Sequence, residues 1–133
     1  MPSISNAELT VITDQPHDLA SITVTCDVTF TEVEVNAMNL LGLQYTLQCR
    51  VINKDLLDDY LVVTYPNVTF PPVATQAERY DRAIFAASTP MNNLHERRIG
   101  KDKLVAELKL ENDETGAQVT QSTEVIDVDF AVR

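Results

Sequence analysis

The chain has few of the residues on which recognisable catalytic sites are built. Its 133 residues include no Trp, two Cys, two His and three Gly. With only Gly42, Gly100 and Gly116 available, the sequence has no glycine-rich phosphate loop, nucleophile elbow or dinucleotide fingerprint. We therefore expect a protein that is not an enzyme. A small hydrolase that uses a pair of carboxylates is the weakest of the alternatives that remain.

Long apolar runs are also missing. No run approaches the roughly 20 apolar residues that a membrane-spanning helix needs. The start of the chain, Met1-Pro2-Ser3-Ile4-Ser5-Asn6, has no basic segment followed by an apolar core, so it does not read as a signal peptide. We expect a soluble protein without membrane insertion, and the sequence assigns it no compartment.

Positive charge is scarce. Ten basic residues stand against 20 acidic ones, which gives a formal net charge of −10. Such a chain repels nucleic-acid phosphates, so we expect no nucleic-acid partner.

What the chain does contain is a repeated alternation of apolar and polar residues, the period of a β-strand with one buried face. In residues 20–30, for example, Ile22, Val24 and Cys26 alternate with Thr23 and Thr25. The alternation is clearest in four stretches: 20–30, 43–52, 103–111 and 124–132. It is weaker in four more: 7–13, 60–65, 68–73 and 77–87.

Seven or eight short strands with turn residues between them predict an all-β fold. We expect a single domain over residues 1–133, a two-sheet antiparallel sandwich of the immunoglobulin-like kind. The hallmarks of antibody domains are missing, because there is no Trp and the 103–111 strand has no cysteine. Residues 31–41 fit either a connecting loop or a helix, and 92–102 fit a long loop.

Cys26 and Cys49 fall on the inward faces of the strands predicted at 20–30 and 43–52. We expect two buried free thiols that pack as small hydrophobic groups. A disulfide between the two sheets is the alternative. Neither cysteine has a sequence neighbour that would make it a nucleophile.

Acidic residues gather in the loops expected at one end of the sandwich, and calcium prefers six to eight oxygen ligands. A calcium-binding module of the C2-like or cadherin-like kind is therefore the first alternative function, and no other cofactor is expected. Cations of the 92–102 loop are the competing partners for these carboxylates. The candidate calcium ligands are Asp14, Asp18, Asp55, Asp58 and Asp59, with His17 beside them.

The leading hypothesis is a non-catalytic binding or assembly module, a structural sandwich that self-associates or docks on another protein. The partner we expect is a protein, a second copy of this chain included. The outward residues of the 43–52 strand are mostly uncharged, Val105 is expected to add an exposed apolar side chain, and segment 4–13 is the expected site of strand exchange. The candidate partner-contact residues are Gln44, Thr46, Gln48, His95, Arg97 and Arg98.

Overall fold

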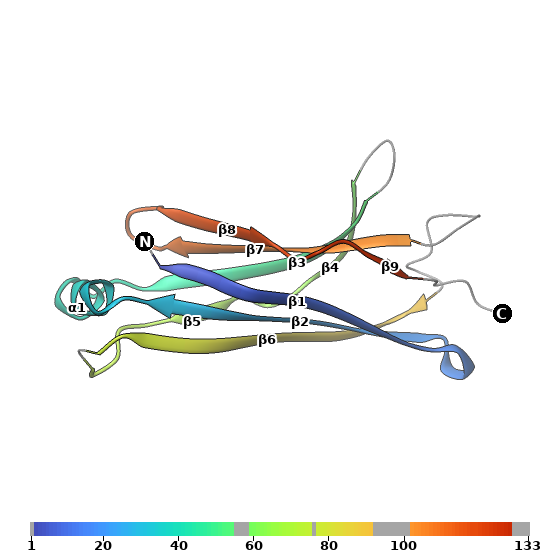
Figure 1. Cartoon of the computed structure of the whole chain (residues 1–133), viewed down its shortest axis with the longest axis horizontal. Helices are drawn as coiled ribbons and strands as arrows, with labels where there is room; N and C mark the ends of the chain where they lie inside the picture. The colour runs from blue at the N-terminus through green and yellow to red at the C-terminus, as the bar shows by residue number, and fades with distance from the viewer. Residues whose placement is uncertain (1, 55–58, 76, 92–101, 129–133) are drawn as a thin grey trace.

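The computed structural model describes residues 2–54, 59–75, 77–91 and 102–128. Within these ranges the chain forms two antiparallel sheets and one α-helix, so the predicted all-β sandwich is confirmed (Figure 1). The strands are β1 (Ser3–Asp14), β2 (Leu19–Phe30), β3 (Tyr45–Lys54), β4 (Asp59–Thr64), β5 (Val68–Phe70), β6 (Arg79–Pro90), β7 (Asp102–Asn112), β8 (Gln118–Ser122) and β9 (Ile126–Val128).

The two sheets differ in size. The smaller sheet has the order β1-β2-β6. The larger sheet has the order β4-β3-β7-β8, with β5 also paired to β3 and β9 also paired to β7. The immunoglobulin-like detail of the prediction stays a prediction.

The core lies between the sheets and is built by the alternation seen in the sequence. On β2, the inward residues from Ile22 to Phe30 are all buried. Facing residues of β3 and β7, among them Leu47 and Leu108, are buried with them. The Tyr65 hydroxyl, also buried, donates a hydrogen bond of 2.8 Å to the carbonyl oxygen of Ile22, which links a segment of the larger sheet to the central strand of the smaller one.

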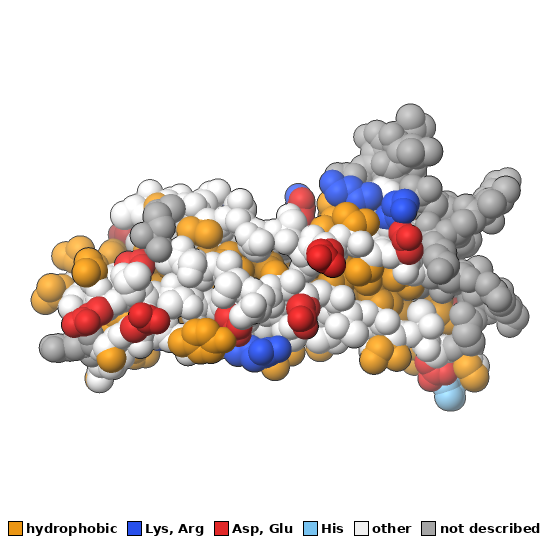
Figure 2. Space-filling view, viewed as in Figure 1, with side chains coloured by type: hydrophobic (Ala, Val, Ile, Leu, Met, Phe, Trp, Pro, Cys, Tyr) orange, Lys and Arg blue, Asp and Glu red, His pale blue; other side chains and the backbone are white. Residues whose placement is uncertain are grey.

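Residues 31–41, which the sequence left open between loop and helix, include the helix α1 (Glu32–Leu41). Thr31 and Glu34 form a capping box at its start, the Ser/Thr-x-x-Glu pattern that satisfies free N–H groups of the first turn. Gly42 ends the helix with a φ of 66°, a left-handed conformation that glycine adopts without steric cost. Figure 2 shows exposed hydrophobic side chains at this end of the molecule, and Leu40 and Leu41 of α1 are among the exposed ones.

Apart from shifts at the ends of other strands, the strands differ from the prediction in three places. The strand expected at 68–73 ends at Phe70, because Pro71 and Pro72 cannot donate to a ladder. Of the strand expected at 124–132, the described residues include β9, and residues 129–133 lie outside the described ranges. β8 was not predicted, because Gln118–Ser122 carries a single large apolar residue. No helix of the described part of the chain is long and apolar enough to cross a membrane.

Candidate binding surface

The outer face of the larger sheet carries the described half of the predicted partner-contact residues. Gln44 precedes β3, and Thr46 and Gln48 follow on its outward side. The side chains of Gln44 and Thr46 donate hydrogen bonds of 2.9 and 2.8 Å to the two carboxylate oxygens of Asp113, which lies in the turn after β7. This turn therefore fixes one end of the face. His95, Arg97 and Arg98 lie outside the described residues.

A groove of about 680 Å³ continues this face from Gln48 onward. Along one side of β3, β4 ends at Thr64 and β5 begins at Val68. Between them, Asn67 and its neighbours pass beside the middle of β3 without forming a strand, and the groove lies there. Its floor is formed by β3, β7 and β8. The outward side chains of these strands that line it are Gln48, Arg50, Glu107, Lys109, Thr120 and Ser122.

The side chains that line the groove include many polar groups and charges of both signs. The Arg50 guanidinium contacts the Glu107 carboxylate at 2.7 Å through Nη2 and at 2.8 Å through Nε. The Arg50 side chain is nevertheless 59% exposed, so a ligand can reach it. Lys109 adds a second cation, and Cys49 and Leu108 also line the groove. The remaining lining residues carry hydroxyl or amide groups. This chemistry suits a polar chain with its own donors and acceptors better than an apolar molecule.

The expected exposure of Val105 is wrong. Val105 is on the outward side of β7 but is 4% exposed. Its partner across the ladder is Ile52 of β3, which is also buried, and the long side chains of Lys103 and Glu107 flank it on β7. Two apolar side chains that oppose each other across a ladder cover part of each other's surface even on an outer face.

Only part of the predicted calcium set can be placed. Asp14 and His17 pair at 2.7 Å in the turn between β1 and β2. Asp18 follows with a φ of 53°. Asp55 and Asp58 lie outside the described residues, and Asp59 begins β4. Among the described residues no three His, Cys, Asp or Glu side chains are close enough to share a metal ion. Figure 1 shows β3 and β4 rising away from the β1–β2 turn.

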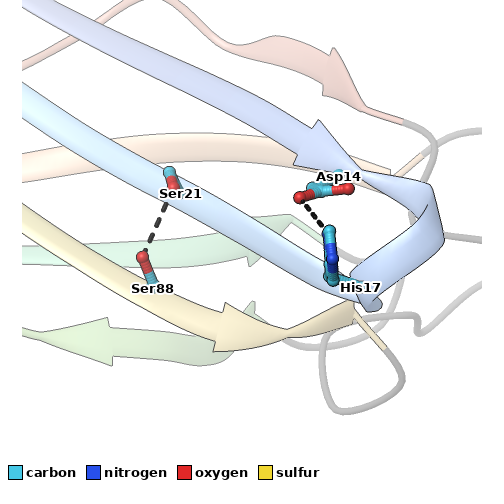
Figure 3. A network of polar contacts seen from close by, with 4 residues as sticks. All are labelled: Asp14, His17, Ser21 and Ser88. Carbon is cyan, nitrogen blue, oxygen red and sulfur yellow. Dashed lines mark hydrogen bonds and ion pairs between the residues drawn. The ribbon is translucent and has the colours of Figure 1, made fainter.

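A hydrogen-bonded Asp–His pair such as Asp14–His17 also occurs in catalytic triads, where a serine hydroxyl contacts the histidine ring. Figure 3 shows it near a second polar pair, in which the hydroxyls of Ser21 and Ser88 lie 3.3 Å apart. The two serines bond to each other across β2 and β6, and neither contacts the His17 ring in this network. The four residues are two separate surface pairs.

Cys26 and Cys49 are buried free thiols, as predicted, on facing strands of the two sheets. Burial raises the pKa of Cys26 to about 11, with the nearby Asp27 carboxylate adding to the effect. Burial raises the pKa of Cys49 to about 12. Both groups are therefore protonated at neutral pH, and a protonated thiol is a poor nucleophile and a poor metal ligand.

One charged group that the sequence did not single out lies on the outer face of the smaller sheet. Asp27 is 2% exposed although its side chain points away from the core. The side-chain amide of Asn6 donates a hydrogen bond of 2.7 Å to it, and Arg82 approaches to 3.9 Å. The hydrogen bond from Asn6, followed by one from Tyr80, lowers the pKa of Asp27. Only pairing across three strands brings these groups together.

A second buried polar pair joins β3 to β7. Asn53 and Asp102 are almost completely buried, and the Asn53 amide donates a hydrogen bond of 3.1 Å to Asp102. Nothing in the sequence distinguishes these residues from turn residues, because both flank segments rich in turn formers. Their pairing depends on the register of β3 against β7.

Comparison with known proteins yields similarity of shape only. No family model matches the chain, and no curated protein matches it. A solved structure from Bordetella pertussis, provisionally named ApaA, aligns over 96% of this chain and 92% of its own with 9% identity and a TM-score of 0.41. The structural-genomics target SoR45 aligns over 96% and 84% with 10% identity and a TM-score of 0.40. Spo0M, a sporulation control protein from Bacillus subtilis, aligns over 96% and 48% with 9% identity and a TM-score of 0.33.

Proposed function

We propose that this protein is a non-catalytic binding module that holds an extended polar segment of another protein in the groove across β3, β7 and β8. The observation that carries the proposal is the groove itself, which is about 680 Å³ in volume and is lined by outward side chains of regular strands. Side chains on paired strands are held in place before a ligand arrives, which lowers the entropy cost of binding.

The chemistry of the lining supports a peptide as the ligand. An extended peptide carries a backbone donor and acceptor at every residue, and the groove offers amide and hydroxyl groups from Gln48, Thr120 and Ser122 to match them. Arg50 and Glu107 pair with each other, and each can also pair with an oppositely charged side chain of the peptide. The groove has two basic residues, Arg50 and Lys109, and one acidic residue, Glu107, in a chain whose net charge is −10.

A peptide library displayed on phage tests the proposal. We expect selection on the wild-type protein to enrich peptides whose affinity falls by about tenfold or more in Arg50→Ala and in a Gln48→Ala/Thr120→Ala double variant, as expected when contacts that dominate an interface are removed. Titration calorimetry with the synthetic peptides measures the affinity.

Arg82→Ala is the matched control, because its side chain is 58% exposed, close to that of Arg50, and lies on the other sheet. It should leave binding unchanged. Enriched peptides that bind the groove variants as tightly as the wild type would refute the proposal.

A further inference from the structure

The strand β6 forms an open edge of the smaller sheet. It pairs with β2 from Arg79 to Pro90 without any shift of register. On its other side no strand of the described chain is hydrogen-bonded to it. Figure 1 shows β6 at the margin of this sheet, with β2 on one side only. Twelve residues is a long edge to leave open, because unpaired strand edges attract other strands.

One hydrogen bond shows which backbone groups face outward. The N–H of Met91 donates to the carbonyl oxygen of Asp18 at 2.9 Å, and this pair continues the β2–β6 register. Hydrogen-bonded and non-hydrogen-bonded pairs alternate along an antiparallel ladder. The odd-numbered residues of β6 therefore bond to β2. The even-numbered residues from Tyr80 to Ser88 direct their N–H and C=O groups away from the sheet.

The side chains of these even-numbered residues are also accessible. Tyr80 is 61% exposed and Ile84 is 63% exposed. From Ala83 to Pro90 the strand has no charged residue, in a chain whose net charge is −10. Charged side chains, bulges and prolines within the strand are the usual protections of an edge. From Ala83 to Pro90, the only one of these protections that β6 has is Pro90 at its end.

The other edge of the same sheet is better protected. β1 shifts register against β2 between Ser5 and Glu8, and Asn6 in this bulge has a φ of 51°. A bulge bends the strand and interrupts its row of free backbone groups. The segment 4–13, which the sequence suggested for strand exchange, is therefore a poorer docking edge than β6.

We propose that β6 pairs with β6 of a second copy of this chain, antiparallel, so that the smaller sheets of two copies become one continuous sheet. Only a register that opposes even-numbered residues joins the free backbone groups. Of the two such registers that use nearly the whole strand, the one with Phe85 on the two-fold axis opposes Tyr80 to Pro90, which has no N–H to donate. The one that keeps these bonds places Ile84 on the axis, opposite its own copy. Arg82 then lies opposite Ala86, and Tyr80 lies opposite Ser88.

The side chains that this register opposes favour a second copy of the chain as the partner of β6. Each charged side chain of β6 meets an uncharged one, so no like charges are opposed, and the exposed isoleucines form an apolar pair at the centre. The overall charge of −10 on each copy still opposes association. Because added salt screens that repulsion, the dimer should become tighter between about 0.05 and 0.5 M NaCl. The groove proposed above lies on the other sheet, so either proposal can fail without the other.

Sedimentation equilibrium of the full chain tests the pairing. We expect the wild type to be a monomer–dimer equilibrium and Ile84→Lys to be monomeric, because the variant opposes two ammonium groups on the axis. Ile12→Lys is the control, since Ile12 is 66% exposed and lies on the other edge strand. It should remain dimeric. Circular dichroism checks that both variants are folded. A monomeric wild type, an Ile84→Lys dimer, or loss of the dimer in both variants would overturn the proposal.

A cross-linking experiment tests the register. Under mild oxidation Ile84→Cys should form a disulfide-linked dimer, because residues opposed on the axis of an antiparallel pair have Cα atoms about 5.5 Å apart. Ile12→Cys should not cross-link at the same protein concentration. The two native thiols are buried and do not compete. Failure of Ile84→Cys to cross-link more than Ile12→Cys would overturn the register with Ile84 on the axis.

Discussion

At the scale of single residues, the buried polar groups are the least ordinary feature of this sandwich. Asp27 keeps its charge on a nearly inaccessible outer site because Asn6 and Tyr80 donate to it and Arg82 is near. A buried carboxylate without such partners would instead take up a proton. The Asn6–Asp27 bond also ties the β1 bulge to the centre of its sheet.

The lowered pKa of Asp27 predicts an effect of pH on stability. In the unfolded chain the carboxyl titrates near its usual value of about 4. Its folded pKa is lower, so the charged form stabilises the fold above about pH 4, and this stabilisation is lost as the pH falls toward the folded pKa. We expect Asp27→Asn to be less stable than the wild type at pH 7, with the difference shrinking below pH 4.

Urea unfolding between pH 2 and 7 measures this difference. Asn6→Ala should shift the acid limb of the wild-type curve toward higher pH, because it removes the largest cause of the lowered pKa. The same change made in the Asp27→Asn background should leave the limb where it was. A difference between wild type and Asp27→Asn that stays constant with pH would contradict the explanation.

At the scale of elements, the helix α1 shows how a local signal decides between two readings. The apolar periodicity over 31–41 is weak, and the flanking strands make a connecting loop as plausible as a helix. The capping box of Thr31 and Glu34 satisfies N–H groups at the helix start from within the segment itself. That pattern is present in the sequence, and it favours the helix over the loop.

Removal of the cap should therefore destabilise the protein. Thr31→Ala leaves the Glu34 N–H without its side-chain acceptor, and we expect a loss of about 1 kcal/mol in the free energy of unfolding, measured with urea. Thr31→Ser keeps the oxygen and should change the free energy of unfolding by much less than Thr31→Ala does, because Ser caps a helix at least as well as Thr. Equal losses in the two variants would show that the methyl group matters rather than the cap.

At the scale of the whole molecule, the contact between the two sheets is apolar except for a few polar links. The Tyr65 hydroxyl reaches from the chain between β4 and β5 to the Ile22 carbonyl oxygen on β2. Burial raises the pKa of this hydroxyl well above its ordinary value, so it remains a donor throughout the neutral range. The link holds the chain at the place where β4 ends and the groove begins.

We expect Tyr65→Phe to lower the free energy of unfolding by about 1 kcal/mol, the usual net value of one buried hydrogen bond. Tyr45→Phe is the control, because no hydrogen bond of the Tyr45 hydroxyl to the described residues is found and its ring packs on Phe30 at 5.1 Å. Thermal unfolding followed by circular dichroism compares the two. A loss in Tyr45→Phe as large as in Tyr65→Phe would refute the role of the link.

The sequence by itself determined the strands that bury one face. Period-two alternation is a local property, so β2, β3 and β7, their inward sides and the burial of Cys26 and Cys49 follow from it directly. The acidic composition likewise set the charge of the surface. The short strand β8 was missed, because a strand at the edge of a sheet needs little apolar pattern of its own.

The tertiary structure determined which strands and side chains are neighbours. The groove exists because β4 ends where it does against β3, and β6 is an edge strand because it pairs with β2 alone among the strands of the described residues. The partners of Asp27 come from the two strands on either side of its own, and Val105 has the buried Ile52 opposite it. Pairing partners and register are long-range choices, fixed by how two faces pack, and the local pattern of one strand does not contain them.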